Sequence, residues 1–363
     1  MVLRVPFRVI LPIAILSVVS TTLSAQSRFQ GFTLPLNSPT KKDWDLFKAV
    51  YVSPEGRVID DMNGNISHSE GQGYGMILAA SNRDLATFSL IWKWTQDNLQ
   101  VRDDGLFAWK WDPARPDDPI SDRNNATDGD LLIAWALQRG GELWKNQLLL
   151  EESKNLLRII RQEMVVDSRY GPVLLPGAEG FQKPEGVVVN PSYWVFPALL
   201  DARRIDPSYL WDALYLSGVR IIAEARFGEW NLTPDWVLLP TSGPPQLPDD
   251  FPSVYGYNAV RIPLYLDWAG EKKKSLYAPF IAWATHIKNV HQLPDVVDLK
   301  TNEPGDYTAM PGMISIYHLI APRKVSPPSS SPTGFTSYYS GCLELLSDLA
   351  AKESRRYSSL SRP

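Results

Sequence analysis

Cysteine and histidine are scarce in this chain of 363 residues. The single cysteine, Cys342, excludes an intramolecular disulfide and a cluster of thiolate metal ligands. A lone cysteine next to an apolar residue is more often a small buried side chain than a nucleophile. Only 4 histidines are present, which argues against a histidine-rich metal site. We therefore expect neither a metal nor an organic cofactor.

Long apolar runs are also lacking, with one exception at the N-terminus. Residues 9–19 are apolar apart from Ser17, Arg4 and Arg8 precede them, and small residues follow as far as Ala25. This pattern is typical of a secretory signal peptide at 1–25, and the run is too short to span a bilayer comfortably. We expect export to the periplasm or the medium without stable membrane insertion. The alternative is an uncleaved anchor.

A strong excess of charge of either sign is missing as well. The net charge is −4 and the pI is about 5.7, which gives no support to a nucleic-acid partner. Aromatic residues, in contrast, are abundant, with 13 Trp, 15 Tyr and 12 Phe. Indole and phenol rings stack on the apolar faces of sugars, so this bias points toward carbohydrate. The alternative is that most of these rings pack in a large helical core.

Helical periodicity dominates after a polar linker, and few stretches resemble strands. The pattern predicts an all-α fold in which paired helices close into a ring, an α/α toroid, with one set of helix ends around a central cleft. We expect one domain at 26–352 and a loose polar tail at 353–363. Gly140 and Gly141 are expected to end a helix, and 165–189 and 238–252 to be irregular. The predicted helices cover residues 43–52, 70–80, 84–99, 127–138, 143–164, 193–202, 207–227, 258–268, 275–290, 310–319 and 335–351.

The segment SEGQGYGM at 69–76 carries the densest chemistry. Glu70 supplies a carboxylate, Gln72 an amide and Tyr74 a ring, and the three glycines let a ligand or another part of the chain approach the backbone. An apolar run follows at once, so the motif lies at the start of a buried helix. The arrangement suits a polar substrate with flat apolar faces, which Tyr74 would contact. The alternative is an exposed Glu70 that only stabilises the helix dipole.

Two further stretches place polar side chains at helix starts. ATDGD at 126–130 holds Asp128 and Asp130 two residues apart, a spacing that does not share one helix face. We expect divided roles, with Asp128 in a cleft and Asp130 bracing or capping the helix. In YGYNAVRIP at 255–263, Asn258 and Arg261 are three residues apart and can line one face beside Tyr257.

Together, the segments at 69–76 and 126–130 resemble the motifs of glycoside hydrolase family 8, and in particular the endoglucanases associated with bacterial cellulose synthesis. NPSY at 190–193, PDW at 234–236 and the segment at 255–263 follow in the expected order. The resemblance implies an (α/α)6 barrel with short extended segments, and hydrolysis of β-linked glucan with inversion. It also implies a β-glucan partner and an association with the cellulose synthase machinery. We expect a monomer.

The resemblance assigns roles to individual residues. Glu70 is implied to be the general acid, and Asp128 to bind and distort the sugar at the cleavage point. A general acid needs burial and a neighbouring anion to stay protonated near neutral pH, so we expect Glu70 and Asp128 to approach each other. The residues implied to line the site are Trp109, as a stacking platform, with Tyr193, Tyr257 and Arg261.

One position departs from the family. Many members carry the general base, an aspartate, where this chain has Asn258, and an amide has no useful basicity. Asn258 therefore remains only a substrate-binding residue. Either another carboxylate activates the water or turnover is weak or absent. The candidate bases are Asp235, Asp249, Asp250 and Glu179, although each alone is more typical of an ordinary loop carboxylate.

These observations predict an exported endo-β-1,4-glucanase that cuts cellulose-like chains. One alternative is the same fold acting on chitosan, xylan or mixed-linkage glucan. The alternative outside the enzymes is a glucan-binding protein that lost turnover when the base became Asn258. A carboxylate from another loop that faces Glu70 across the cleft would favour an enzyme.

Overall fold

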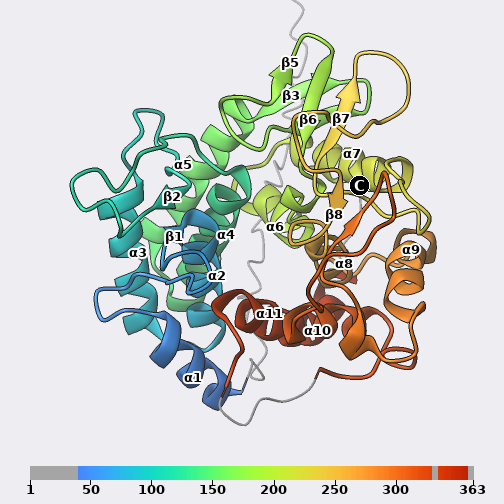
Figure 1. Ribbon diagram of the computed structural model, residues 1–363. Coiled ribbons are helices and arrows are strands. Elements are labelled where there is room, and N and C mark those ends of the chain that lie inside the picture. The colour runs from blue at the N-terminus through green and yellow to red at the C-terminus, as the bar shows by residue number, and fades with distance from the viewer. Residues whose placement is uncertain (1–39, 329–333, 359–363) are drawn as a thin grey trace, which may run out of the picture. The chain divides into compact units, whose positions relative to one another are not determined.

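The computed structural model describes residues 40–328 and 334–358, all of which belong to one compact unit spanning 33–363. The predicted signal peptide at 1–25 and the last part of the predicted tail, 359–363, lie outside the described residues. Helices dominate the described part of the chain (Figure 1), as the periodicity predicts. They are α1 (Lys41–Tyr51), α2 (Ser69–Ser81), α3 (Leu85–Leu99), α4 (Thr127–Trp144), α5 (Gln147–Glu163), α6 (Phe196–Ile205), α7 (Tyr209–Glu224), α8 (Arg261–Trp268), α9 (Lys274–Thr285), α10 (Pro311–Ile320) and α11 (Tyr338–Ser358).

Buried helices alternate with amphipathic ones along the chain. α2 and α4 are buried on nearly all sides, which fits sequences that are apolar or small around the whole helix. None of the described helices has the length and apolar character needed to cross a bilayer. α5, in contrast, buries one stripe and exposes the rest, and its buried residues are Leu149, Ser153, Leu156, Leu157 and Ile160.

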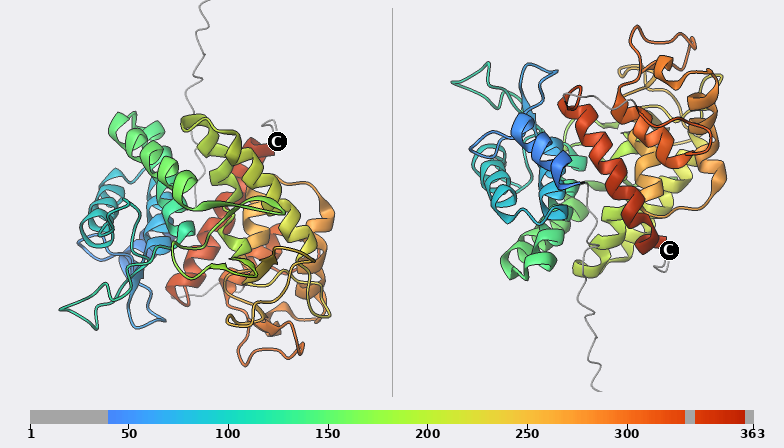
Figure 2. Two further views of the ribbon diagram at one scale, coloured as in Figure 1. Left: turned by 90° about the horizontal axis from the view of Figure 1, so that it is seen from above. Right: turned by 90° about the horizontal axis from the view of Figure 1, so that it is seen from below.

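Packing between the buried helices closes on itself. α2 packs against α4, α4 against α6, and α6 against α8. α8 contacts both α10 and α11, and α11 returns to α2. Seen from below, α11 lies between the N-terminal helices and those of the C-terminal half (Figure 2). This closed ring of paired helices is the α/α toroid that the helical pattern predicts, and it agrees with the (α/α)6 barrel that the resemblance implies.

The first turns of several helices meet at one end of the ring. Residues at or just before the start of α2, α4, α8, α10 and α11 line the same cleft. Helix N-termini carry partial positive charge from their unpaired N–H groups. This end of the barrel is therefore suited to hold carboxylates.

Strands are short and lie in the connections. β1 (Ser67–His68) pairs with β2 (Lys110–Trp111), β3 (Val165–Ser168) with β4 (Gly171–Leu174), and β8 (Val254–Tyr255) with β9 (Val297–Asp298), all antiparallel. β6 (Gly186–Val189) lies between β5 (Gln182–Lys183) and β7 (Val237–Pro240). The prediction that 165–189 is irregular is therefore wrong, because four short strands fall within it. Its glycines and prolines mask the alternation that would have revealed them.

The predicted end of α4 is also wrong. The helix continues through Gly140 and Gly141 and ends at Trp144. A Cβ atom at Gly140 would lie 2.8 Å from the ring of Phe88 on α3. These glycines permit close packing between helices, whereas the sequence suggests a helix stop.

The loose tail expected from 353 is not observed in the described residues, because α11 continues to Ser358. Glu353 is buried in an ion pair with Arg139, with 2.6 Å between Oε1 and Nη2. The hydroxyl of Tyr357, also buried, donates to Asp201 at 2.7 Å. These long-range contacts hold the last turns of the helix against the barrel, and a polar composition alone does not reveal them.

Candidate active site

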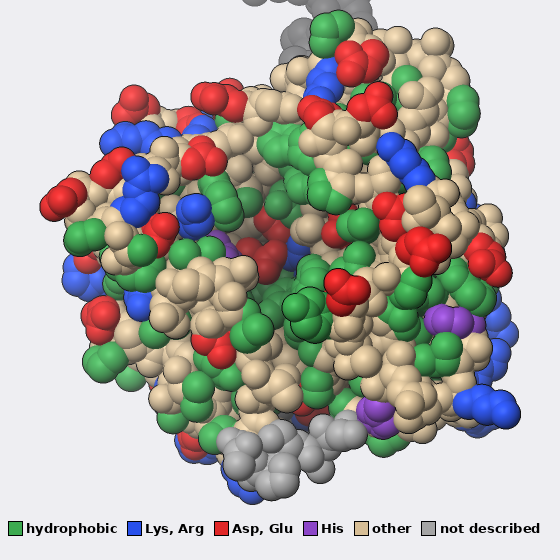
Figure 3. Space-filling view, in the orientation of Figure 1, with side chains coloured by type: hydrophobic (Ala, Val, Ile, Leu, Met, Phe, Trp, Pro, Cys, Tyr) green, Lys and Arg blue, Asp and Glu red, His purple; other side chains and the backbone are tan. Residues whose placement is uncertain are grey.

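An open cleft lies where the helix ends meet. It consists of two adjoining hollows of about 480 and 650 Å³, within the usual range for ligand sites. Figure 3 shows the cleft as a depression with acidic side chains and a histidine at its floor and hydrophobic side chains around it. The residues shared by both hollows are Asp60, Asn63, His68, Glu70 and Asn258.

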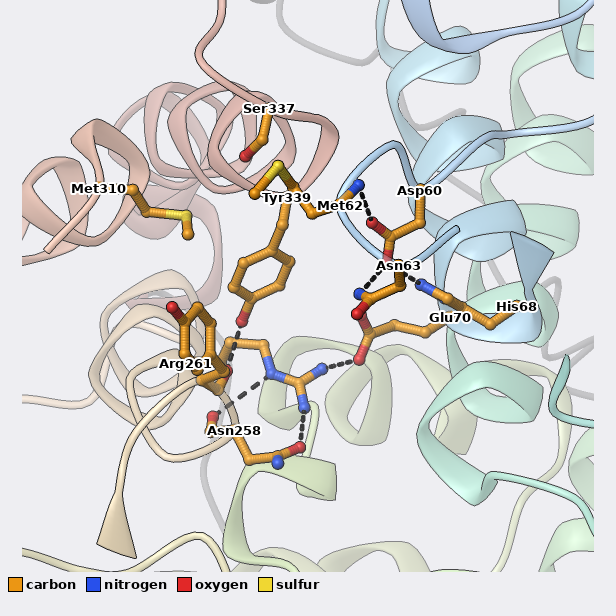
Figure 4. Close-up of a pocket in the computed structure, with 11 residues that line it drawn as sticks. Asp60, Met62, Asn63, His68, Glu70, Asn258, Arg261, Met310, Ser337 and Tyr339 are labelled. Atoms are coloured by element: carbon orange, nitrogen blue, oxygen red, sulfur yellow. Dashed lines mark hydrogen bonds and ion pairs between the residues drawn. The ribbon is translucent and has the colours of Figure 1, made fainter. Parts of the chain in front are cut away.

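Arg261 joins the two acids predicted for the site, and Figure 4 shows its contact with one of them, Glu70. Its Nη1 contacts a carboxylate oxygen of Glu70 and lies 3.1 Å from Oδ2 of Asp128. Its Nη2 donates to Oδ1 of Asn258 at 2.8 Å and to Oγ of Ser192 at 3.0 Å. Since Arg261 is only 2% exposed, the guanidinium is fixed beneath the cleft. The prediction that Glu70 and Asp128 approach each other is confirmed, because both bind the same nitrogen.

Burial distinguishes the two acids. The side chain of Asp128 is 1% exposed and that of Glu70 is 17% exposed. Burial and the charge of Glu70 raise the pKa of Asp128 well above its usual value, against the opposing charge of Arg261. Asp128 therefore retains its proton to higher pH than an exposed carboxyl would. Glu70 lines both hollows and is the more accessible of the two acids to a ligand.

Glycines let the two acid-bearing helices come together. Glu70 is the second residue of α2, and Asp128 is the second residue of α4. A Cβ atom at Gly129 would lie 2.1 Å from Oγ of Ser69, and one at Gly73 would lie 2.6 Å from a side chain of α4. Substitution at either glycine would push α2 and α4 apart, so the glycines of both motifs are needed to place the acids side by side.

Asp130 has a different role from Asp128, as the two-residue spacing predicts. Its carboxylate accepts hydrogen bonds from the backbone N–H of Phe107 at 2.9 Å and from Nδ2 of Asn125 at 2.8 Å. It is fully buried, and burial raises its pKa to about 7. Asp130 thus braces the start of α4 against the preceding connection and does not line the cleft.

Three of the predicted aromatic residues line the cleft, namely Trp109, Tyr193 and Tyr257. The indole N–H of Trp109 donates to Oδ2 of Asp122 at 2.8 Å, which fixes one edge of the ring. Tyr257 is 42% exposed, and its hydroxyl donates to Oδ2 of Asp295 at 2.6 Å. These positions are suited to stacking on sugar faces, and the binding roles stay predictions.

Tyr74 does not lie in the cleft, and the prediction that it contacts substrate is wrong. It is fully buried, with its hydroxyl 2.7 Å from that of Tyr265 and 3.1 Å from Nη1 of Arg261. Tyr74 follows Glu70 by four residues and so lies on the same helix face, but one turn deeper in the barrel. It supports Arg261 from below.

Asn258 stands on the α8 side of the cleft, whereas Glu70 comes from α2 (Figure 4). Its Nδ2 lies 3.4 Å from Oδ2 of Asp235. Asp235 is buried and accepts from the backbone N–H groups of Gly256 at 3.0 Å and Ala259 at 2.7 Å. Burial raises the pKa of Asp235. This aspartate holds the turn before α8 and does not line the cleft.

The other three candidate bases are also placed elsewhere. Asp249 and Asp250 line a separate hollow beside the β5–β6–β7 sheet, and Asp250 pairs with Lys183. Glu179 is exposed, and its backbone hydrogen bonds to Asn124. The selection of these residues as bases is therefore wrong, because proximity in sequence to Asn258 does not bring the loop at 238–252 to the cleft.

Sequence reasoning missed two carboxylates and a histidine that line the cleft, which are Asp60, Asp112 and His68. His68 directly precedes the motif at 69–76, so its position was a usable signal. Asp60 and Asp112 lie in connections and have no spacing rule that relates them to Glu70.

The chain is similar over most of its length to known proteins of one family. The family model described as Glycosyl hydrolases family 8 matches residues 5–353. A probable endoglucanase of Novacetimonas hansenii is 36% identical over 326 residues, which cover 89% of this chain and 94% of that protein.

Solved structures show the same architecture. An endo-β-1,4-glucanase from Acetobacter xylinum matches with a TM-score of 0.79 and 36% identity, over 86% of this chain and 98% of that chain. An endoglucanase from Klebsiella pneumoniae, described as a family 8 glycosyl hydrolase, matches with a TM-score of 0.80 and 34% identity, over 87% and 100% of the two chains.

Proposed function

The chain belongs to glycosyl hydrolases family 8, and on this basis we propose that it is an exported endo-β-1,4-glucanase that hydrolyses cellulose-like β-glucan with inversion. The observation that carries the proposal is the placement of Glu70 and Asp128 on one nitrogen of Arg261, at an open cleft lined by aromatic rings. The similar proteins named endoglucanases support the substrate class.

In this proposal Glu70 is the general acid. The raised pKa of Asp128 keeps a proton beside Glu70, which takes it up, and a bound glucan chain excludes water from the two acids. Glu70 then transfers the proton to the leaving glycosidic oxygen, while Asp128 stays on Arg261 and hydrogen bonds to the sugar at the cleavage point. Water attacks the anomeric carbon from the opposite face of the ring, which inverts the configuration.

Asn258 cannot activate this water, because an amide cannot accept the proton. Two further carboxylates line the cleft, Asp60 and Asp112. Asp60 already accepts hydrogen bonds from three donors, Met62 N, Asn63 Nδ2 and His68 Nε2. Asp112 accepts one, from the backbone N–H of Ala114 at 2.9 Å. Asp112 is therefore the freer acceptor and our candidate for the general base.

Three wider features belong to the same proposal. The apolar run at 9–19 supports export. The resemblance of the motifs at 69–76 and 126–130 to the endoglucanases associated with bacterial cellulose synthesis supports a link to that machinery. We propose that the protein acts as a monomer, since the cleft is built from helices of one chain.

Reducing-sugar release by the purified protein tests the substrate class. Carboxymethylcellulose, chitosan, xylan and mixed-linkage glucan are compared, with Glu70→Gln run alongside. We expect release from carboxymethylcellulose that is lost in Glu70→Gln. Release confined to chitosan, xylan or mixed-linkage glucan would reject the cellulose-like substrate. Binding of glucan without release from any substrate would identify a binding protein, and Asn258→Asp would then be the variant to restore turnover.

A further inference from the structure

Asp60 and His68 form a pair at the edge of the cleft that the mechanism above does not use. Both line the two hollows together with Glu70, and both are largely withdrawn from solvent, with side chains 6% and 16% exposed. His68 directly precedes α2, and Asp60 lies on the connection between α1 and β1. Figure 4 shows the two side chains beside Glu70 on the same side of the cleft.

The two ring nitrogens of His68 have different partners. Nδ1 accepts a hydrogen bond from the backbone N–H of Gly71 at 3.0 Å, so it carries no proton. Nε2 lies 3.3 Å from Oδ2 of Asp60, so it is the nitrogen that carries the proton. The two contacts together select the neutral Nε2–H tautomer of His68.

Asp60 is built to stay ionised and to hold this ring. Burial opposes ionisation, but hydrogen bonds from His68 and Asn63 lower the pKa of Asp60 below its usual value. Oδ1 accepts from the backbone N–H of Met62 at 3.1 Å, and Oδ2 accepts from Nδ2 of Asn63 at 2.7 Å. The carboxylate therefore anchors both the imidazole and the loop that overhangs the cleft.

The contact to Gly71 links the imidazole to Glu70. His68 is the N-cap of α2, and its Nδ1 satisfies one of the backbone N–H groups that a helix start leaves unpaired. Gly71 adjoins Glu70 in the same first turn. The ring of Tyr338 packs edge-on against His68, with 5.7 Å between centroids and 70° between planes. A Cβ at Gly71 would lie 2.6 Å from the Tyr338 hydroxyl, so the ring, the cap and the helix start fit as one unit.

We propose that His68, oriented by Asp60, is a positioning residue for Glu70, and that only its neutral Nε2–H form keeps the first turn of α2 in the geometry that hydrolysis needs. The inference rests on the proposed role of Glu70 as general acid. Protonation of Nδ1 places an N–H against the N–H of Gly71, which breaks the cap and releases the turn that carries the acid.

Charged and titratable groups from every neighbouring element surround His68. Asp60 from the connecting loop and Glu70 from α2 are the acids that line the cleft with it. Lys110 is the cross-strand partner of His68 on β2. Tyr338 from α11 presents a ring edge. Because a proton on Nδ1 is incompatible with the hydrogen bond from Gly71, we expect the imidazolium form of His68 to be the less active one.

Nuclear magnetic resonance tests the tautomer directly. The chain has 4 histidines, so the signals of His68 are those that disappear from ¹⁵N-labelled protein in His68→Asn. Long-range ¹H–¹⁵N spectra at the pH of full activity are expected to show a protonated Nε2 and an unprotonated Nδ1. A protonated Nδ1 at that pH, in either the neutral or the charged ring, would overturn the proposal. This readout does not depend on the role of Glu70.

Kinetics of matched variants test the positioning role. His68→Ala removes the cap and is expected to lower kcat by about tenfold or more with little change in KM, because small displacements of a reacting group are costly. His68→Asn keeps an oxygen that can accept from Gly71 and is expected to restore most of that loss. Since an amide does not titrate, the acid limb of kcat/KM in His68→Asn should move by about half a pH unit or more to lower pH.

The control is His291→Asn, which changes an exposed histidine away from the cleft and should leave kcat and the pH profile as in the wild type. Unchanged kcat in a folded His68→Ala protein, or an unmoved acid limb in His68→Asn, would refute the positioning role. An active Glu70→Gln enzyme would instead remove the general acid from the proposed function, and the tautomer measurement would still stand.

Discussion

Replacing Glu70 by Gln is expected to lower kcat on carboxymethylcellulose by about a thousandfold, the middle of the range for loss of a general acid or base. Glutamine cannot donate a proton to the leaving oxygen, but its carbonyl can still accept from Arg261, so the fold should be retained. On an aryl β-cellobioside whose leaving group needs no proton, Glu70→Gln should lose much less activity. The measurement consists of initial rates on both substrates, and thermal unfolding is recorded for each protein to check its fold.

The matched control is Glu179→Gln, the same chemical change at an exposed acid outside the cleft. It should hydrolyse both substrates at the wild-type rate. If Glu70→Gln kept more than about a tenth of the wild-type rate on carboxymethylcellulose, Glu70 would not be the general acid. Equal losses on the two substrates would assign Glu70 to binding and not to protonation of the leaving group.

Replacing Arg261 by Met is expected to remove activity and also to destabilise the protein strongly. The guanidinium is 2% exposed and binds both Glu70 and Asp128, of which Asp128 is fully buried. Removing one partner of a buried ion pair leaves an uncompensated charge and typically costs about 3–5 kcal/mol of unfolding free energy. Denaturant unfolding at neutral pH measures this loss.

Two further variants separate charge from geometry at Arg261. Arg261→Lys keeps the charge but lacks the planar group with which arginine reaches five side chains, so it should recover part of the stability and little of the activity. Arg220→Met breaks an exposed pair with Glu224 on α7 and should leave unfolding nearly unchanged. A folded, active Arg261→Met protein as stable as the wild type would refute the view that this arginine holds the acid pair.

Much of the fold is predictable because α2, α4 and α5 show their burial in their sequences. The residues of α2 are apolar or small on all faces of the helix, whereas α5 has one apolar stripe. These two patterns distinguish inner from outer helices. The errors have a common cause. Gly140 and Glu353 look like signals for a helix end and a loose tail, and only their tertiary partners, Phe88 and Arg139, show otherwise.

The acids of the site are predictable for a local reason. Glu70 and Asp128 each lie in the first turn of a helix, beside glycines that allow the two helices to approach closely. Each motif therefore contains both the acid and the small residues that place it. Asp60 and Asp112 reach the cleft through connections whose paths depend on the folded barrel. For the same reason, closeness to Asn258 in the sequence does not identify the carboxylates that line the cleft.

The most direct measurement is ¹H nuclear magnetic resonance of the anomeric protons during the first minutes of cellopentaose hydrolysis. Inverting cleavage of a β-1,4 linkage releases the new reducing end as the α-anomer, which then equilibrates with the β-anomer. We predict that the α-anomer signal rises first and that neither signal rises with Glu70→Gln. Early release of the β-anomer would require a retaining reaction and would contradict the proposed mechanism.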